Sequence, residues 1–365
     1  MRWIARAASL FGRSAAAALA LAAVMNATPE IEWFASSSMS SPAFAAEPAK
    51  GTPTAGPEMG KAAADAKATD ALAKTPIVAA KTVFGAAETP APLAARAIGF
   101  YSRGCLAGAV PVPIDGDTWQ VMRLSRNRNW GHPNLIKLLE RLAEDGAAKD
   151  GWPGLLVGDI SQPRGGPMLT GHNSHQIGLD ADVWLTPMPE RRLTAVEREK
   201  LSATSMLGKD GIEADPEVFS PHHAAIIRRA ASYPQVERVL VHAGIKKAMC
   251  AEKGADRTHF YKVRPYWGHH YHMHIRIGCP KDSANCRGQA PTAGDDGCGA
   301  EIDDWIARLK QPPKPPVAGA KPVLPKPPIT LDDLPAECRM VVTANDAAER
   351  RAEDGQGKRA SGGSR

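Results

Sequence analysis

Gly268–Pro280 reads GHHYHMHIRIGCP and is the most informative stretch of the chain. It places His272 and His274 on either side of Met273, in a run that continues with apolar residues. Alternate side chains of a β-strand point to the same face of its sheet, so we expect both imidazoles to face the same way. The stretch therefore predicts a strand that presents two histidines to one site.

A second polar stretch, at residues 171–185, reads GHNSHQIGLDADVWL. It contains His172, His175, Asp180 and Asp182, and its second half alternates apolar with acidic residues. Together the two stretches can supply two imidazoles, one carboxylate and additional histidines to one centre. A catalytic zinc ion uses three protein ligands and leaves one position for water. We therefore interpret the chain as a zinc hydrolase with zinc as its cofactor.

The N-terminus has the features of an export signal. Three arginines precede the apolar run Ala15–Val24, and a small-x-small cleavage site follows at residues 43–45. The apolar run is too short to span a bilayer, so we expect cleavage rather than a stable membrane anchor. This pattern predicts a protein exported to the periplasm.

Cysteine content and charge agree with that location. The chain has six cysteines and no CxxC pair, and an even number in an exported protein is more typical of disulfides than of metal thiolates. Residue spacing alone leaves the pairing open. The formal charge of +6 suits an acidic polymer such as a cell wall. No basic and aromatic residues interleave as in a nucleic-acid groove, so we expect no nucleic-acid partner.

Apolar periodicity predicts the secondary structure around the two polar stretches. Further strands are expected at 119–123, 154–160 and 236–242. Helices are expected at 135–146, 221–232, 245–254 and 301–309. The remaining histidines are assigned to helix ends or to the surface: His132, His222, His223, His242 and His259. We expect an α+β fold with a central antiparallel sheet that carries the zinc site, flanking helices, disulfides, and disordered extensions at both ends.

At this point the sequence resembles a known family. The pattern Ser174-His175-Gln176-x-Gly178-Leu179-Asp180-x-Asp182, followed by GHHYHMHIR, is similar to the penicillin-insensitive murein endopeptidases. These belong to a group of zinc peptidases that includes lysostaphin, the D-Ala-D-Ala metallopeptidases and the hedgehog signalling domain. The resemblance extends from about Ile98 to Cys338, through GHPNLIKLLERL, VGDISQPRGG, KVRPYW and DGCGAE. It implies cleavage of the D-alanyl–meso-diaminopimelyl cross-link of peptidoglycan, the expected partner.

The resemblance also implies roles for individual residues. His175, Asp182 and His274 correspond to the zinc ligands, and His172 to a further histidine near the metal. His272 corresponds to the base or transition-state stabiliser, with His269 beside it. The implied disulfides join Cys105 to Cys338, Cys250 to Cys298, and Cys279 to Cys286.

Two further assignments are less direct. Some family members carry an accessory metal at an Asp-Gly-x-His segment, which here reads Asp210-Gly211-Ile212-Glu213. Glutamate replaces the histidine, so Asp210 is either part of a second metal site or part of a solvated loop. Arg164 and the Lys262/Arg264 pair are candidates for binding substrate carboxylates, because Arg suits bidentate contacts, or they are parts of a turn and a strand edge.

The expected organisation combines these features. It comprises a signal peptide at 1–46, a flexible Ala/Pro-rich segment at 47–96, a zinc peptidase domain at 97–310, a proline-rich linker and tail at 311–340 tethered through Cys338, and a disordered tail at 341–365.

Other functions are considered beside the endopeptidase. A D-Ala-D-Ala carboxypeptidase could use the same scaffold, and a non-catalytic wall-binding module could keep zinc structurally. His272 and His269 argue against the second alternative, since a structural site does not need them. A serine hydrolase is disfavoured because no GxSxG motif occurs, and neither polar stretch is an HExxH helix.

Overall fold

A computed structural model of the chain describes residues 78–292, 294–312 and 327–344. The predicted signal peptide, residues 47–77 of the Ala/Pro-rich segment, most of the proline-rich linker and the last 21 residues, 345–365, lie outside these ranges. Within the ranges, no helix has the length and apolar character needed to cross a membrane.

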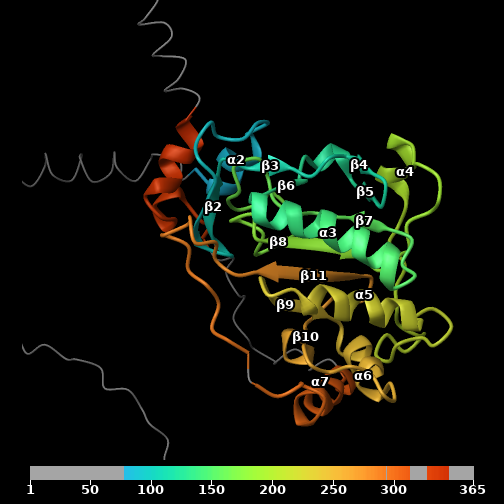
Figure 1. Ribbon diagram of the computed structural model, residues 1–365. Coiled ribbons are helices and arrows are strands. Elements are labelled where there is room, and N and C mark those ends of the chain that lie inside the picture. Colours follow the sequence, from blue (N-terminus) through green and yellow to red (C-terminus); the bar gives the residue numbers. More distant parts are fainter. Residues whose placement is uncertain (1–77, 293, 313–326, 345–365) are drawn as a thin grey trace, which may run out of the picture. The chain divides into compact units, whose positions relative to one another are not determined.

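A seven-stranded sheet forms the centre of the fold (Figure 1), in the order β10-β9-β11-β8-β7-β5-β4. β11 pairs antiparallel with β8 and β9, and β8 pairs antiparallel with β7. The prediction of an antiparallel sheet therefore describes its centre, whereas the β9–β10 and β5–β7 pairs are parallel. The strands are β4 Asp115–Gly116, β5 Trp119–Val121, β7 Leu155–Val157, β8 Asp180–Trp184, β9 Val236–Val241, β10 Val263–Pro265 and β11 His272–Ile277.

Two smaller strand pairs lie outside this sheet. β1 (Arg96–Phe100) pairs with β2 (Arg103–Ala107), and β3 (Val110–Pro111) pairs with β6 (Trp130–Gly131). The sequence did not predict them, because short apolar pairs broken by glycine and proline resemble loops.

β11 divides its side chains between the two faces of the sheet. Met273, Ile275 and Ile277 belong to the main apolar core, which also contains the buried stripes of α3 (Pro133–Lys149) and α5 (Pro221–Ser232). The two histidines of the strand alternate with these residues and so face the opposite side. One face of β11 therefore contributes the two histidines to the candidate site, and its other face packs into the core.

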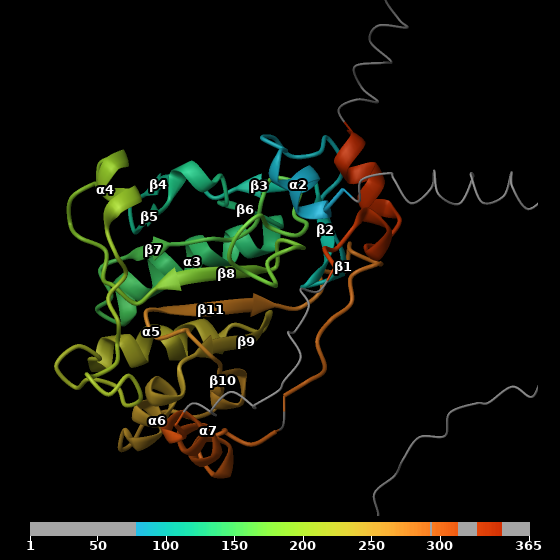
Figure 2. The ribbon, with the colours of Figure 1, turned by 180° about the vertical axis from the view of Figure 1, so that it is seen from behind.

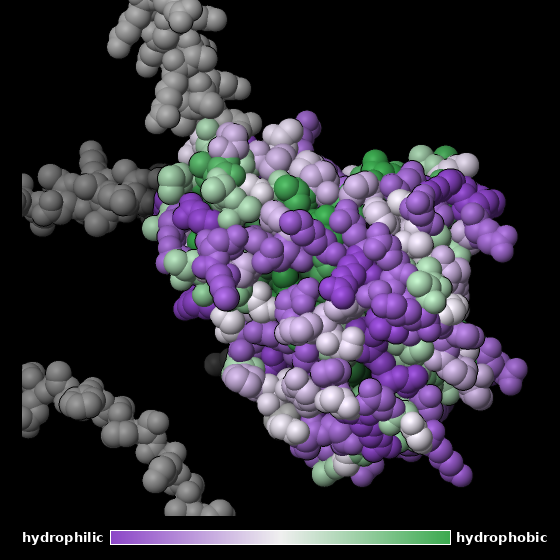
Figure 3. Space-filling view, viewed as in Figure 1, coloured by the Kyte–Doolittle hydropathy of each residue, from purple (hydrophilic) through white to green (hydrophobic). Residues whose placement is uncertain are grey.

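α3 and α5 cover the core face of the sheet, as the two opposite views show (Figures 1 and 2). Hydrophilic side chains predominate on the outer surface of this side (Figure 3). His132 caps α3 by accepting the Asn134 N–H, and His242 caps α6 in the same way. Both therefore serve helix ends. The other helices are α2 Ala80–Gly85, α4 Ala195–Lys200, α6 Ala243–Ala251, α7 Ala300–Lys310, η1 Leu124–Arg126, η2 Phe260–Lys262 and η3 Leu331–Asp333.

The two ends of the described chain form a second, smaller core. Phe84 of α2 is fully buried and belongs to the same apolar cluster as Leu334 and Val341. The Ala80 N–H donates to the Ile329 carbonyl at 2.7 Å. The prediction of a flexible segment is therefore wrong for residues 78–96, and that of a disordered tail is wrong for residues 341–344, which are helical.

Three disulfides join Cys105 to Cys338, Cys250 to Cys298, and Cys279 to Cys286. These are the pairs that the family resemblance implied. The first ties β2 to the C-terminal segment, and the third closes a short loop directly after β11. The described chain is therefore fastened both near the site and between its two ends.

We expect the first disulfide to contribute most to stability. It closes a loop with a sequence separation of 233 residues, for which the chain-entropy model gives roughly 5 kcal/mol at most. The Cys279–Cys286 loop, with a separation of 7, should contribute only about half as much. Chemical denaturation of the Cys105→Ala/Cys338→Ala and Cys279→Ala/Cys286→Ala double variants measures both. Equal losses would show that loop length does not govern the stabilisation.

Candidate metal centre

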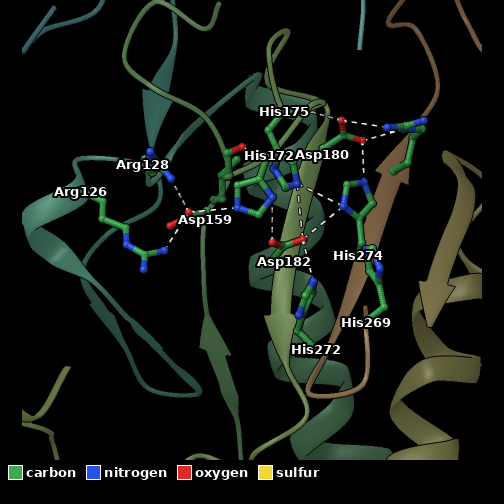
Figure 4. A network of polar contacts seen from close by, with 12 residues as sticks. Arg126, Arg128, Asp159, His172, His175, Asp180, Asp182, His269, His272 and His274 are labelled. Atoms are coloured by element: carbon green, nitrogen blue, oxygen red, sulfur yellow. Dashed lines mark hydrogen bonds and ion pairs between the residues drawn. The ribbon is translucent and has the colours of Figure 1, made fainter. Parts of the chain in front are cut away.

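The pairing of β8 with β11 assembles the site. His274 lies directly opposite Asp182 in the antiparallel register, and His272 lies opposite Trp184. His175 precedes β8 in a left-handed backbone conformation (φ 67°). Figure 4 shows these imidazoles converging on the Asp182 carboxylate. The two polar stretches of the sequence therefore meet at one point on the open face of the sheet.

Three candidate ligand atoms form a compact triangle. His175 Nε2 lies 3.1 Å from His274 Nδ1. Asp182 Oδ1 lies 3.4 Å from the first nitrogen and 3.2 Å from the second. Ligands of a tetrahedral zinc ion with bonds of 2.0–2.1 Å are separated by roughly 3.3 Å. The triangle therefore has the size of one face of a zinc tetrahedron.

Hydrogen bonds on the far side of each ring set the tautomers. His175 Nδ1 donates to the Ile160 carbonyl at 2.7 Å, and His274 Nε2 donates to Asp180 Oδ1 at 3.0 Å. In neutral imidazoles with these tautomers, the two nitrogens that face each other in the triangle carry lone pairs. Asp182 Oδ1 is buried without a hydrogen bond among the described residues. Two imidazole nitrogens and one carboxylate oxygen, buried at this separation, are a donor set that fits a metal ion.

Asp180 supports the triangle from behind. It is fully buried, accepts the His175 backbone N–H at 3.0 Å, and pairs with Arg276 Nε at 2.7 Å. Burial alone would raise the pKa of Asp180, but Arg276 and His274 hold it well below its usual value. The carboxylate is therefore charged and orients the His274 ring, as carboxylates behind metal-bound histidines commonly do.

This arrangement predicts the behaviour of Asp180→Asn. The neutral amide keeps the shape of the side chain but weakens the hold on His274 Nε2 and on Arg276. Loss of such a supporting partner typically costs about 10- to 100-fold in metal affinity. Competition with a chelator of known affinity measures the change, and circular dichroism checks the fold. An unchanged affinity in a folded variant would show that Asp180 serves packing only.

His172 adds a further donor beside the triangle. Its Nε2 lies 3.1 Å from Asp159 Oδ2, and its Nδ1 lies 3.6 Å from Asp182 Oδ2. His172, His175 and Asp182 together are close enough to share a metal ion. Burial raises the pKa of Asp159, but hydrogen bonds from His172 and Arg128 and the charge of Arg126 outweigh it and bring the pKa to about 2.

His272 and His269 lie on the other side of the Asp182 carboxylate. His272 Nε2 is 3.6 Å from Asp182 Oδ1, and its Nδ1 is buried without a partner in the described part of the chain. His269 Nδ1 donates to the Trp267 carbonyl at 2.7 Å, and its ring centroid is 4.8 Å from that of His272. Burial, and then the charges of His272 and His274, lower the pKa of His269 to about 3. Both rings are placed near the triangle without belonging to it.

Two adjoining cavities open at the centre. One of about 770 Å³ is lined by His272, His274 and the exposed aromatic residues Tyr266 and Trp267. The other, of about 290 Å³, is lined by Asp182 and residues on the β5 side of the sheet. His172 and His272 line both cavities. An extended chain can therefore approach the triangle from either side.

Two sequence assignments lie away from this centre. Arg164 is buried, and its guanidinium donates to the carbonyls of Thr89, Val341 and Val342. It binds backbone from both ends of the described chain and lines neither of the cavities beside the triangle, which favours the alternative that it belongs to a structural turn. Asp210 lies in an exposed turn, where its carboxylate accepts the N–H groups of Ile212 and Glu213.

Glu213 pairs with Lys247 at 2.7 Å rather than with Asp210. Among the described residues, the group close enough to share a metal ion is His172, His175 and Asp182, and it includes neither acid. The sequence reasoning missed the roles of Asp159 and Asp180. For Asp180 a signal existed, because it shares its strand face with Asp182; for Asp159, a lone acid after a strand, the signal was weak.

Comparisons with known proteins identify the family of the chain. The model of the family "Penicillin-insensitive murein endopeptidase" matches residues 97–343. A protein of that name from Haemophilus influenzae is 42% identical over 228 residues, which cover 62% of this chain and 78% of the relative. One from Yersinia enterocolitica is 38% identical over 278 residues, covering 76% and 96%. The chain therefore belongs to the penicillin-insensitive murein endopeptidase family.

Proposed function

We propose that this protein is a zinc-dependent murein endopeptidase of the periplasm that hydrolyses the D-alanyl–meso-diaminopimelyl cross-link of peptidoglycan. The observation that carries the proposal is the triangle of two imidazole nitrogens and one carboxylate oxygen, all buried and 3.1–3.4 Å apart. Its position between two cavities supports the cleavage of an extended, branched substrate. The predicted signal at residues 1–46 supports the location.

In this proposal His175, Asp182 and His274 hold the zinc ion, with His172 as a further donor. Two nitrogens and one carboxylate oxygen form a ligand set that is common in catalytic zinc sites. Zinc bound there would lower the pKa of a coordinated water to about 7 and polarise the scissile carbonyl. The buried Asp180 orients the His274 ring, and the buried Asp159 orients the His172 ring.

His272 and His269 are the proposed catalytic side chains. His272 faces the cavity at the open side of the triangle, and Nε2 lies close to the Asp182 carboxylate. A neutral imidazole in this position can accept a proton from the attacking water and pass it to the leaving amine. The His269 ring lies beside that of His272, with 4.8 Å between the centroids and the planes tilted by 45°. Tyr266 and Trp267 offer apolar walls for the stem peptide.

Digestion of purified murein tests the function. The enzyme should release uncross-linked muropeptides from cross-linked dimers, and a chelator should stop the release. Uncross-linked pentapeptides, offered separately, test the D-Ala-D-Ala carboxypeptidase alternative, because that enzyme would release D-alanine from them. Dimers left intact by the zinc-loaded enzyme, while murein is still bound, would favour the wall-binding module.

A further inference from the structure

Arg238 lies on the same face of the sheet as the ligand triangle. In the pairing of β9 with β11, Leu240 is opposite His274 and Arg238 is opposite Arg276. A residue two positions along the partner strand is about 7–8 Å away between Cα atoms, which is within the length of an arginine side chain. Arg238 and His274 line the same cavity. The guanidinium can therefore reach a group that is bound beside the triangle.

Positive charge is concentrated at this end of the cavity. Arg238, Arg264 and Arg276 all line it. Arg276 is paired with Asp180, and Arg264 is paired with Asp295 and Glu301. The guanidinium of Arg238 donates to the Ala290 carbonyl at 2.6 Å, and within the described ranges it forms no ion pair. Burial, and then the charge of Arg276, lower its pKa. Two arginines are thus neutralised by carboxylates, whereas the third is held by a neutral carbonyl.

We propose that Arg238 binds the substrate carboxylate that is attached to the carbon bearing the leaving nitrogen. This inference rests on the proposed function. In a D-alanyl–meso-diaminopimelyl amide, the carbon bonded to the scissile nitrogen also carries a free carboxylate. With the scissile carbonyl at the triangle, this carboxylate enters the larger cavity toward β9. Arginine binds carboxylates through two parallel N–H bonds, so Arg238 would fix the orientation of the leaving group.

A pair of substrates isolates this contact. Cross-linked muropeptide dimers are prepared with the carboxyl group beside the scissile amide either free or amidated. Arg238→Gln should lower kcat/KM for the free carboxylate by about 10- to 100-fold, the range for a lost charge-assisted hydrogen bond, mainly through KM. For the amidated dimer the same substitution should change kcat/KM only slightly. Arg238→Lys keeps the positive charge but cannot form two parallel N–H bonds, so it should recover part of the loss.

Arg287→Gln is the matched control. Arg287 is exposed and does not line the cavity, so this variant removes one positive charge without removing the contact. It should leave both substrates unaffected. If Arg238→Gln reduced cleavage of both dimers equally, Arg238 would shape the cavity without binding the carboxylate. If it reduced neither, the carboxylate would bind elsewhere.

Binding of the product separates this inference from the proposed function. The zinc-loaded protein is titrated calorimetrically with the released stem peptide, whose diaminopimelyl carboxylate is again free or amidated. Wild-type protein should prefer the free carboxylate, and Arg238→Gln should lose that preference. A wild-type protein that showed this preference but cleaved no murein would contradict the proposed function alone. Cleavage of murein without any preference would contradict the role of Arg238 alone.

Discussion

Asp182→Ala should purify without its zinc ion and without measurable cleavage of murein. Asp182 Oδ1 is the atom common to both short contacts with His175 and His274, and it is the acidic member of the triangle. Without it, two neutral imidazoles remain to hold the ion. Because the nucleophile depends on the metal, activity should disappear rather than decline. Metal analysis of the purified variant, beside turnover of cross-linked dimers, measures both effects.

Asp210→Ala is the matched control for this loss of a carboxylate. Asp210 lies in an exposed turn, where its carboxylate accepts the backbone N–H groups of Ile212 and Glu213. This variant should keep about one zinc per chain, as in the wild type, and nearly full activity. Full metal occupancy in Asp182→Ala would refute the ligand assignment. Loss of zinc in Asp210→Ala would point to a second metal at the turn.

His272→Ala should distinguish residues that bind the metal from residues that act only in catalysis. His272 Nε2 lies 3.6 Å from Asp182 Oδ1, but the ring is not a corner of the triangle. Removing a general acid–base group typically costs about 10²- to 10⁴-fold in rate. We therefore expect His272→Ala to keep its zinc and its fold but to lose most of its turnover.

His274→Ala provides the comparison from the same face of the same strand. His274 is a corner of the triangle and is hydrogen-bonded to Asp180, so this variant should lose both zinc and activity. Zinc content measured side by side distinguishes the two histidines. A metal-free His272→Ala would make His272 a ligand and would overturn the division of roles.

The sequence predicted the site better than it predicted the surroundings of the site. Alternation around Met273 was enough to place two histidines on one strand face, because the period of a strand is two residues. The register of β8 against β11 could not be read from either stretch alone. A slip by one residue would turn all side chains of one strand to the other face. The pairing of His274 with Asp182 depends on the whole sheet.

The sequence was least informative where the partners of a residue are distant along the chain. Arg164 was a candidate for binding substrate carboxylates because arginine suits bidentate contacts. Its acceptors are carbonyls of residues 89, 341 and 342, which no local pattern connects with it. Phe84 was assigned to a flexible segment for the same reason, since the local composition contains few apolar residues. The apolar cluster that contains it includes Leu334, Cys338 and Val341 of the C-terminal segment.

The second, smaller core also affects how the chain can fold while it is being synthesised. A ribosome makes residues 78–96 early and residues 327–344 near the end, yet Phe84 and Val341 share one apolar cluster and Ala80 is bonded to Ile329. The apolar cluster around Phe84 is therefore complete only when nearly the whole chain has been synthesised. A nascent or prematurely terminated chain would display this unfinished surface. Quality-control proteases and chaperones could thereby distinguish it from the completed enzyme.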